Sequence, residues 1–141
     1  MDIVYTRQFA CIEIKHTTEM GYGVYATRDF EKGELIERCY CIKICDLEKD
    51  IPADLKNYAF QYPPGREESA KYYVLPLGYG CVYNHSDDNN AKWVLSKYPM
   101  FFDYLAIKNI NKGEQIFTNY GNYEFPRKEE LWQQKISYYS I

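Results

Sequence analysis

The amino-acid sequence predicts a mainly β fold, built of several small sheets with few short helices. Short apolar and aromatic segments recur along the chain at irregular spacing, and Gly, Pro, Asn or Asp bounds most of them. Strands do not alternate with long helical patterns, so a doubly wound parallel sheet is not expected. The 141 residues suffice for one hydrophobic core, and we therefore expect a single domain over residues 1–141.

The N-terminal part of the chain is expected to form short strands joined by turns. Residues 1–15 alternate loosely between apolar and polar types, which predicts one or two strands, and the polar residues 16–20 predict a loop. Gly21-Tyr22-Gly23 then precedes an apolar strand. Its glycines either let the backbone approach a ligand or form a tight turn. It lacks the third glycine and the following helix of a dinucleotide fingerprint.

Two later segments share the pattern Lys-Gly-Glu-x-Ile, starting at Lys32 and at Lys112. Each glycine is expected to adopt a positive φ angle in a turn that leads into a strand. The remaining elements are expected to be strands over residues 34–45 and 115–119, a short helix over 53–61, a surface loop over 63–69, an edge strand over 71–77 that ends at Pro76, strands over 91–96 and 101–108, and a helix over 126–136.

Composition and charge argue against several classes of function. The net charge is -3 and no basic stripe stands out, so direct nucleic-acid binding is not expected. No apolar run approaches the roughly 20 residues of a membrane span, and the residues after Met1 do not open a signal peptide. We therefore expect an intracellular protein, without a membrane partner, whose cysteines are reduced.

Cysteine and tyrosine are both frequent in this chain. Cys39, Cys41 and Cys45 share one face of a predicted strand and have no His nearby, which predicts buried cysteines and no metal site. The 16 tyrosines suit a pocket or an interface, because the side chain is half apolar and half hydrogen-bonding.

A candidate binding turn lies near the middle of the chain. An apolar segment that begins at Gly78 runs into Asn84, His85 and Ser86, and short polar residues follow. Directional donors and acceptors at such a reversal predict ligand binding, and a polar loop after a strand is the simpler alternative.

Three stretches occur in an order and with a content that resemble the SET domain of protein-lysine methyltransferases. They are Gly21-Tyr22-Gly23-Val24-Tyr25-Ala26, Asn84-His85-Ser86 with Asn90 four residues later, and Gly113-Glu114-Gln115-Ile116-Phe117-Thr118-Asn119-Tyr120-Gly121. The similarity spans roughly residues 4–123 and leaves 124–141 as a C-terminal tail. It is strongest to the short stand-alone SET proteins of viruses, in which Tyr-x-Phe also precedes Gly-aromatic-Gly, as Tyr58-Ala59-Phe60 precedes Gly78-Tyr79-Gly80 here.

The resemblance implies a β-clip fold in which the C-terminal segment threads through a loop to form a pseudo-knot. It also implies methyl transfer from S-adenosyl-L-methionine to a lysine ε-amine of a protein, such as a histone or another chromatin protein. That reaction needs a neutral amine, in-line geometry and exclusion of water, and it needs no metal or nucleophilic side chain.

Particular residues acquire roles by their match to the family motifs. Tyr120 is implied as the catalytic tyrosine, and a structural tyrosine at a strand end is the alternative. The residues implied in cofactor binding are Gly21, Tyr22, Gly23, Asn84 and His85. The residues implied in the lysine channel are Tyr58, Tyr79, Tyr123 and Phe125. For Tyr58, packing of a helix face is the alternative.

The sequence also departs from the family pattern. The cysteine-rich flanking segments that bind zinc are absent, so the tail would complete the channel. Glu124 stands where an aromatic residue often limits the number of methyl groups added, and Asn89 replaces a common Pro. Two alternative functions are a module that binds a peptide or the cofactor without turnover, and a structural protein that self-associates through tyrosine-rich surfaces. The resemblance suggests a homodimer, which is nuclear or host-nuclear if the substrate is a histone and cytoplasmic otherwise.

Overall fold

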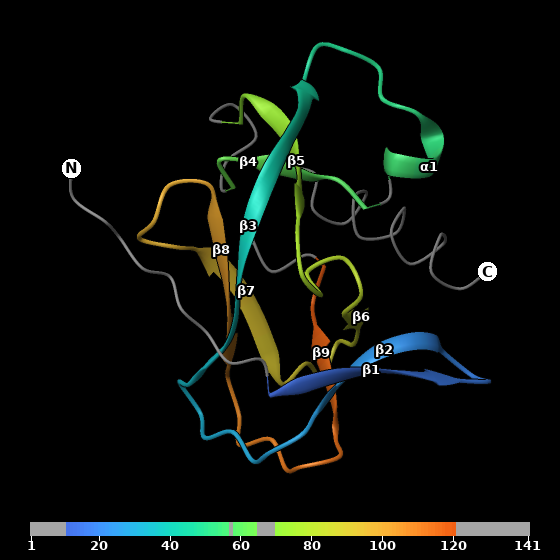
Figure 1. Cartoon of the computed structure of the whole chain (residues 1–141), viewed down its shortest axis with the longest axis vertical. Coiled ribbons are helices and arrows are strands. Elements are labelled where there is room, and N and C mark those ends of the chain that lie inside the picture. The colour runs from blue at the N-terminus through green and yellow to red at the C-terminus, as the bar shows by residue number, and fades with distance from the viewer. Residues whose placement is uncertain (1–10, 57, 65–69, 121–141) are drawn as a thin grey trace.

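A computed structural model of the chain describes residues 11–56, 58–64 and 70–120. These residues form strands and one short helix, which Figure 1 labels. In chain order the elements are β1 (Ile12–Thr17), β2 (Gly21–Ala26), β3 (Leu35–Asp46), α1 (Ala53–Lys56), β4 (Phe60–Tyr62), β5 (Tyr72–Pro76), β6 (Asn84–His85), β7 (Ala91–Leu95), β8 (Phe101–Ala106) and β9 (Gln115–Thr118).

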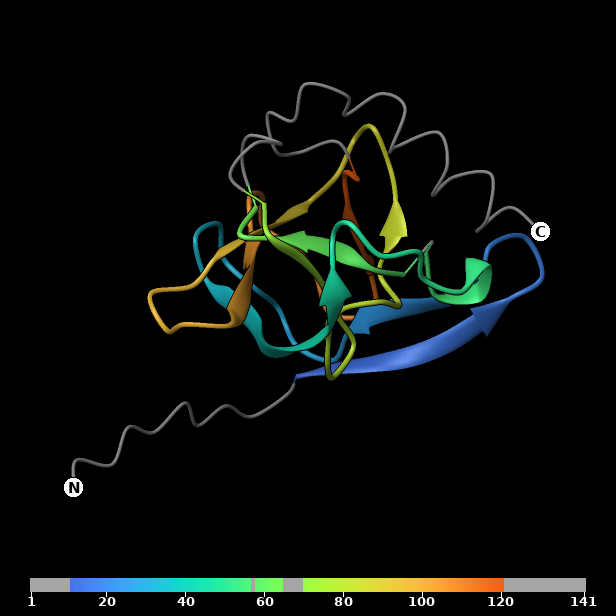
Figure 2. The ribbon, with the colours of Figure 1, turned by 90° about the horizontal axis from the view of Figure 1, so that it is seen from above.

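The strands form two sheets, which confirms the predicted fold of small sheets with little helix. One sheet has the order β1-β2-β9-β6 and the other has the order β4-β5-β3-β8-β7. Neighbouring strands are antiparallel except β6 and β9, which run parallel. The β1–β2 hairpin extends away from the five-stranded sheet in both views of the ribbon (Figures 1 and 2).

Strand β3 runs through the middle of the five-stranded sheet and contributes to the hydrophobic core. Cys39 and Cys41 are buried on one face, as their spacing predicts, whereas Cys45 is only half-buried. A shift of register between Lys43 and Cys45 interrupts the alternation and accounts for the difference. Among residues 11–56, 58–64 and 70–120, no three His, Cys, Asp or Glu side chains gather as a metal site would require.

The two Lys-Gly-Glu turns lie side by side and bond to each other. Gly33 has a φ of 95° and Gly113 a φ of 91°, which confirms the predicted positive φ angles. Phe30 and Ile110, which precede the two turns, exchange backbone hydrogen bonds of 2.8 Å in both directions, and both side chains are buried. This pairing ties the β2–β3 connection to the β8–β9 connection, so it helps to place β9 beside β2.

Two predictions at the hairpin and the central strands need correction. The predicted loop over residues 16–20 is shorter, because β1 continues to Thr17 and pairs in register with Gly21 of β2. Gly21-Tyr22-Gly23 therefore belongs to a strand and does not form a free loop. Strand β5 is not an edge strand, because it lies between β4 and β3.

The helix after β3 is shorter than predicted. It ends at Lys56 and buries none of its residues. Phe60 begins strand β4 instead, and its ring packs edge-on against Trp93 with ring centroids 4.9 Å apart. Because Tyr58 follows the helix, the hypothesis that it packs a helix face is wrong.

Several predictions concern residues outside the described ranges. They are the first strand segment around residues 3–5, the middle of the loop over 63–69, the helix over 126–136, and the threading of the segment after Tyr120. No helix in the part of the chain that the structure describes is long and apolar enough to cross a membrane.

Candidate functional site

The three motifs found in the sequence become three neighbouring strands of one sheet. The first motif forms β2, the second begins with β6 and the third includes β9, which lies between them. Val24 of β2 pairs with Ile116 of β9, and Asn84 of β6 pairs with Phe117 of β9. Side chains from distant parts of the sequence therefore come together on this sheet.

The side chain of Asn90 bonds directly to the backbone of strand β9. Its side-chain amide donates to the carbonyl of Gln115 at 2.9 Å, and its side-chain oxygen accepts from the N–H of Phe117 at 2.8 Å. One carboxamide thus satisfies a donor and an acceptor of the β9 backbone, as a neighbouring strand would. This contact gives a structural reason for the last Asn of the second motif.

Asn84 is 5% exposed and connects β6 to the other two strands. Its side-chain nitrogen donates to the carbonyl of Tyr22 at 3.0 Å and to Oε1 of Gln115 at 2.8 Å. Gly23 leaves room for this arrangement, because a Cβ at that position would lie 2.4 Å from the same Gln115 oxygen. The Asn84 side-chain oxygen accepts no hydrogen bond from the described residues, so this acceptor is available to a ligand.

Tyr120 lies directly against His85. Its backbone N–H donates to Nδ1 of His85 at 3.1 Å, and the ring centroids are 5.0 Å apart. The Tyr120 hydroxyl donates to the carbonyl of Tyr83 at 3.0 Å. Because Nδ1 accepts a hydrogen bond, the ring proton belongs on Nε2, which lies 3.0 Å from a carboxylate oxygen of Asp87.

Both rings are neutral at physiological pH, and burial reinforces that state. It raises the pKa of the Tyr120 phenol above its usual value, and a hydrogen bond from the His85 backbone opposes part of that increase. Burial also lowers the pKa of His85, and contact with Asp87 opposes this effect. A protonated phenol and a neutral imidazole suit orientation of reactants better than proton transfer.

The predicted channel residues are only partly described. Tyr58 lies close enough to Tyr120 that it contributes to the raised pKa of the Tyr120 phenol. The ring of Tyr79 is half-buried and packs against the hydrophobic core. Tyr123 and Phe125 lie outside the described residues.

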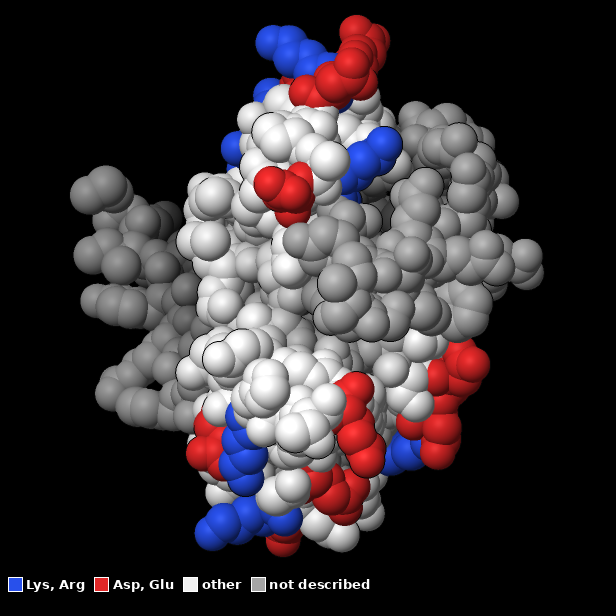
Figure 3. Space-filling view, turned by 90° about the vertical axis from the view of Figure 1, so that its right-hand side faces the viewer, with Lys and Arg blue, Asp and Glu red and all other residues white. Residues whose placement is uncertain are grey.

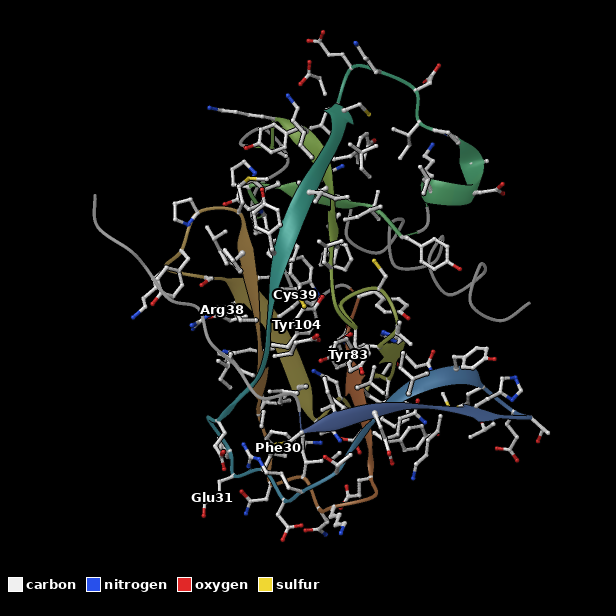
Figure 4. All side chains as sticks on the ribbon, in the orientation of Figure 1. Phe30, Glu31, Arg38, Cys39, Tyr83 and Tyr104 are labelled. Atoms are coloured by element: carbon white, nitrogen blue, oxygen red, sulfur yellow. The ribbon has the colours of Figure 1, made fainter. Side chains whose placement is uncertain are left out.

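A buried carboxylate that the sequence interpretation missed lies beneath this site. Glu37 is 5% exposed and accepts hydrogen bonds from the Tyr79 N–H at 2.9 Å and the Tyr83 hydroxyl at 2.8 Å. Burial raises its pKa, and these two hydrogen bonds oppose the increase. In Figure 4, Tyr83 and Tyr104 lie on the side of β3 that faces β6 and β9. Glu37 therefore anchors the tyrosine whose carbonyl holds the Tyr120 hydroxyl.

Gly78 and Gly80 leave room for the buried carboxylate of Glu37 and for its neighbours. A Cβ on Gly78, whose φ is 72°, would lie 2.3 Å from a carboxylate oxygen of Glu37. A Cβ on Gly80 would lie 2.6 Å from Pro76. These glycines therefore allow side chains of the protein core to approach the backbone closely.

The sequence contained a signal for Glu37. It shares the odd-numbered spacing of Cys39 and Cys41, so a strand with those cysteines buried also turns Glu37 inward. A shift of register between Leu35 and Glu37 allows Ile36 to be buried as well.

On the face shown in Figure 3, the described charged side chains are of both signs and gather toward its two ends. No continuous basic stripe crosses the described part of that face.

Comparison with known proteins gives concordant matches. The profile of the SET domain matches residues 21–121. The chain is 22% identical over 129 residues to the Schizosaccharomyces pombe histone-lysine N-methyltransferase specific for lysine 37 of H3, covering 89% of this chain and 84% of that protein. It is 25% identical over 129 residues to the Plasmodium falciparum variant-silencing SET domain-containing protein, covering 81% of this chain and 5% of that protein.

Solved structures show the same similarity. A Plasmodium falciparum protein assigned as a histone methyltransferase superposes with a TM-score of 0.67 and 32% identity, covering 83% of this chain and 98% of that chain. A chain from the structure of ctPRC2 superposes with a TM-score of 0.56 and 21% identity, covering 79% of this chain and 14% of that chain, which shows a shared fold.

Proposed function

This chain belongs to the SET-domain family, and from that premise we propose that it is a protein-lysine N-methyltransferase that uses S-adenosyl-L-methionine. The main structural support is the Tyr120 hydroxyl, which is held by the backbone of Tyr83 on the sheet that also carries Asn84 and Gly23. The proposed catalytic and cofactor-binding residues thus lie on or beside one sheet.

The described residues fit the proposed cofactor. The side-chain oxygen of Asn84 is a free acceptor in a nearly buried residue, which suits an ammonium group. The backbone of Tyr22 lies beside it within strand β2, which also carries Gly21 and Gly23, and His85 is its neighbour in strand β6. When bound, S-adenosyl-L-methionine supplies an electrophilic methyl group and the positive charge of a sulfonium.

Tyr120 and its neighbours then have the task of orienting the reactants and excluding water. The phenol is protonated at neutral pH, and its hydroxyl keeps a fixed direction because it donates to the Tyr83 carbonyl. His85 fixes the backbone of Tyr120 through Nδ1. A lysine has a solution pKa of about 10.4, and desolvation beside a cation favours its neutral, nucleophilic form. Positioning then supplies most of the acceleration.

The proposed substrate is an exposed lysine of a histone or another chromatin protein. Two relatives that cover most of this chain are histone methyltransferases by name. We accordingly propose a nuclear or host-nuclear site of action.

Replacement of Tyr120 by Phe tests the proposal. With labelled cofactor and mixed histones, we expect the variant to transfer methyl groups at least about 100-fold more slowly, because it loses the hydroxyl that orients the reaction. Its dissociation constant for S-adenosylhomocysteine, measured by calorimetry, should stay within about threefold of the wild type. Tyr40→Phe, on the exposed side of β3, is the matched control and should behave as the wild type.

Two results would contradict the proposal in different ways. Unchanged methyl transfer by Tyr120→Phe would show that this tyrosine is structural. Cofactor binding by the wild type with no transfer to any histone or lysine-rich protein would support the alternative of a binding module without turnover.

A further inference from the structure

We propose that Gln115 is a positioning residue that fixes the orientation of the Asn84 carboxamide, so that Asn84 presents its oxygen, and not its nitrogen, to the cationic amino-acid end of the cofactor. The inference rests on the function proposed above. Gln115 occupies the variable position of the third motif, and no role follows for it from the resemblance.

The orientation of the two amides is determined by a backbone group. The atom of the Asn84 side chain that lies 3.0 Å from the Tyr22 carbonyl must be the nitrogen, because a carbonyl oxygen can only accept. The same nitrogen lies 2.8 Å from Gln115, so Gln115 must present its oxygen there. The other end of Gln115 is then its nitrogen, which donates to the Tyr25 hydroxyl at 3.0 Å.

This chain of hydrogen bonds uses both N–H groups of Asn84. Because these two N–H groups point at strands β2 and β9, the oxygen of the Asn84 amide points away from both strands. Without Gln115 the preference of Asn84 would rest on the Tyr22 carbonyl alone. The reversed amide would present two N–H donors to an ammonium group, which has no acceptor to offer them.

Gly23 supports the same arrangement. A Cβ there would lie 2.4 Å from Oε1 of Gln115 and 2.8 Å from Nδ2 of Asn84, so the two amides meet in the space that the glycine leaves free. Gln115 is itself half-buried, which protects its hydrogen bonds from competition by water. The Tyr22 carbonyl thus identifies the Asn84 nitrogen, and Gln115 and Gly23 hold the amide in that orientation.

Binding of two ligands distinguishes a positioning role of Gln115 from a general structural role. They are S-adenosylhomocysteine and its analogue that lacks the α-amino group, each titrated calorimetrically into the full chain. For Gln115→Met, which keeps the length of the side chain but has no amide, we expect about tenfold weaker binding of S-adenosylhomocysteine, the effect of a lost hydrogen bond to a charged group. Binding of the deaminated analogue should change by less than about twofold.

Gln115→Glu is the rescue variant. A carboxylate still accepts from the Asn84 nitrogen, and the Tyr25 hydroxyl turns to donate to its second oxygen. We expect this variant to bind S-adenosylhomocysteine as tightly as the wild type, or more tightly. It also keeps the test valid if Gln115→Met does not fold.

The outcomes distinguish this inference from the proposed function. Equal weakening of both ligands by Gln115→Met, or loss of the preference for the amino group in Gln115→Glu, would overturn the positioning role while the proposed function stands. A wild-type chain that binds neither ligand would overturn the proposed function and this inference with it.

Discussion

Replacing Gly23 by alanine is expected to destabilise the protein and to weaken cofactor binding together. The added Cβ would lie 2.4 Å from Oε1 of Gln115 and 2.8 Å from Nδ2 of Asn84, whereas ordinary contact begins at 3.4 Å. The oxygen of Gln115 must therefore retreat by about 1 Å. Such a movement breaks the 2.8 Å hydrogen bond between the two amides.

The magnitude follows from opposing contributions. Overpacking of a close-packed site costs about 1–3 kcal/mol. The lost hydrogen bond adds about 1 kcal/mol, and alanine regains about 0.5–1 kcal/mol relative to glycine in a strand. We expect the free energy of unfolding to fall by about 1–3 kcal/mol, and the dissociation constant for S-adenosylhomocysteine to rise about tenfold because Asn84 loses its fixed orientation.

Urea unfolding and calorimetry measure the two effects, and Gly33→Ala is the matched control. Gly33 has a φ of 95° with nothing within 4 Å of an added Cβ, so its substitution introduces backbone strain without a clash. That variant should lose about 1–2 kcal/mol of stability and keep the wild-type affinity. The reasoning would be refuted if Gly23→Ala bound the ligand like the wild type, or if Gly33→Ala lost as much affinity.

Two other perturbations probe the frame beneath the site. Burial raises the pKa of Glu37, so the folded state binds more protons than the unfolded state just above the usual carboxyl pKa, and this group's contribution to stability declines as pH rises through that window. In urea unfolding at stepped pH, Glu37→Gln should lose this decline, and an unchanged pH profile would contradict the assignment. Asn90→Ala leaves two backbone groups of β9 without their partners and should lower the free energy of unfolding by about 2–4 kcal/mol. Asn89→Ala, which removes a single local hydrogen bond, should cost about 1 kcal/mol, and equal costs for the two variants would contradict the role of Asn90.

Much of the local structure could be predicted from the sequence. The glycines of the two Lys-Gly-Glu turns adopt the expected positive φ angles, and strands follow both turns as expected. The alternation around Cys39 and Cys41 correctly predicted burial. These features depend on the conformational freedom of glycine and on the period of two residues in a strand, which act over a few neighbouring residues.

The structure of residues 53–61 and 71–77 was predicted less well, because it depends on contacts with residues distant in sequence. Residues 53–61 have helical spacing, yet Phe60 is drawn into strand β4 by packing against Trp93. Residues 71–77 read as an edge strand, yet β4 pairs with their outer side. Tertiary burial thus overrode local propensity in both places.

By itself, the sequence determined the two Lys-Gly-Glu turns and most of the strands, and it contained the three motifs that mark the family. Only the tertiary structure decided that β9 lies between β2 and β6, that Glu37 is buried beneath Tyr83, and that Gln115 joins Asn84 to Tyr25. The physical reason is the distance along the chain over which each effect acts. Backbone preferences and the alternation of side chains in a strand depend on neighbouring residues. Strand order and buried hydrogen bonds depend on residues far apart in sequence, because the folded chain must pair every polar group that it removes from water.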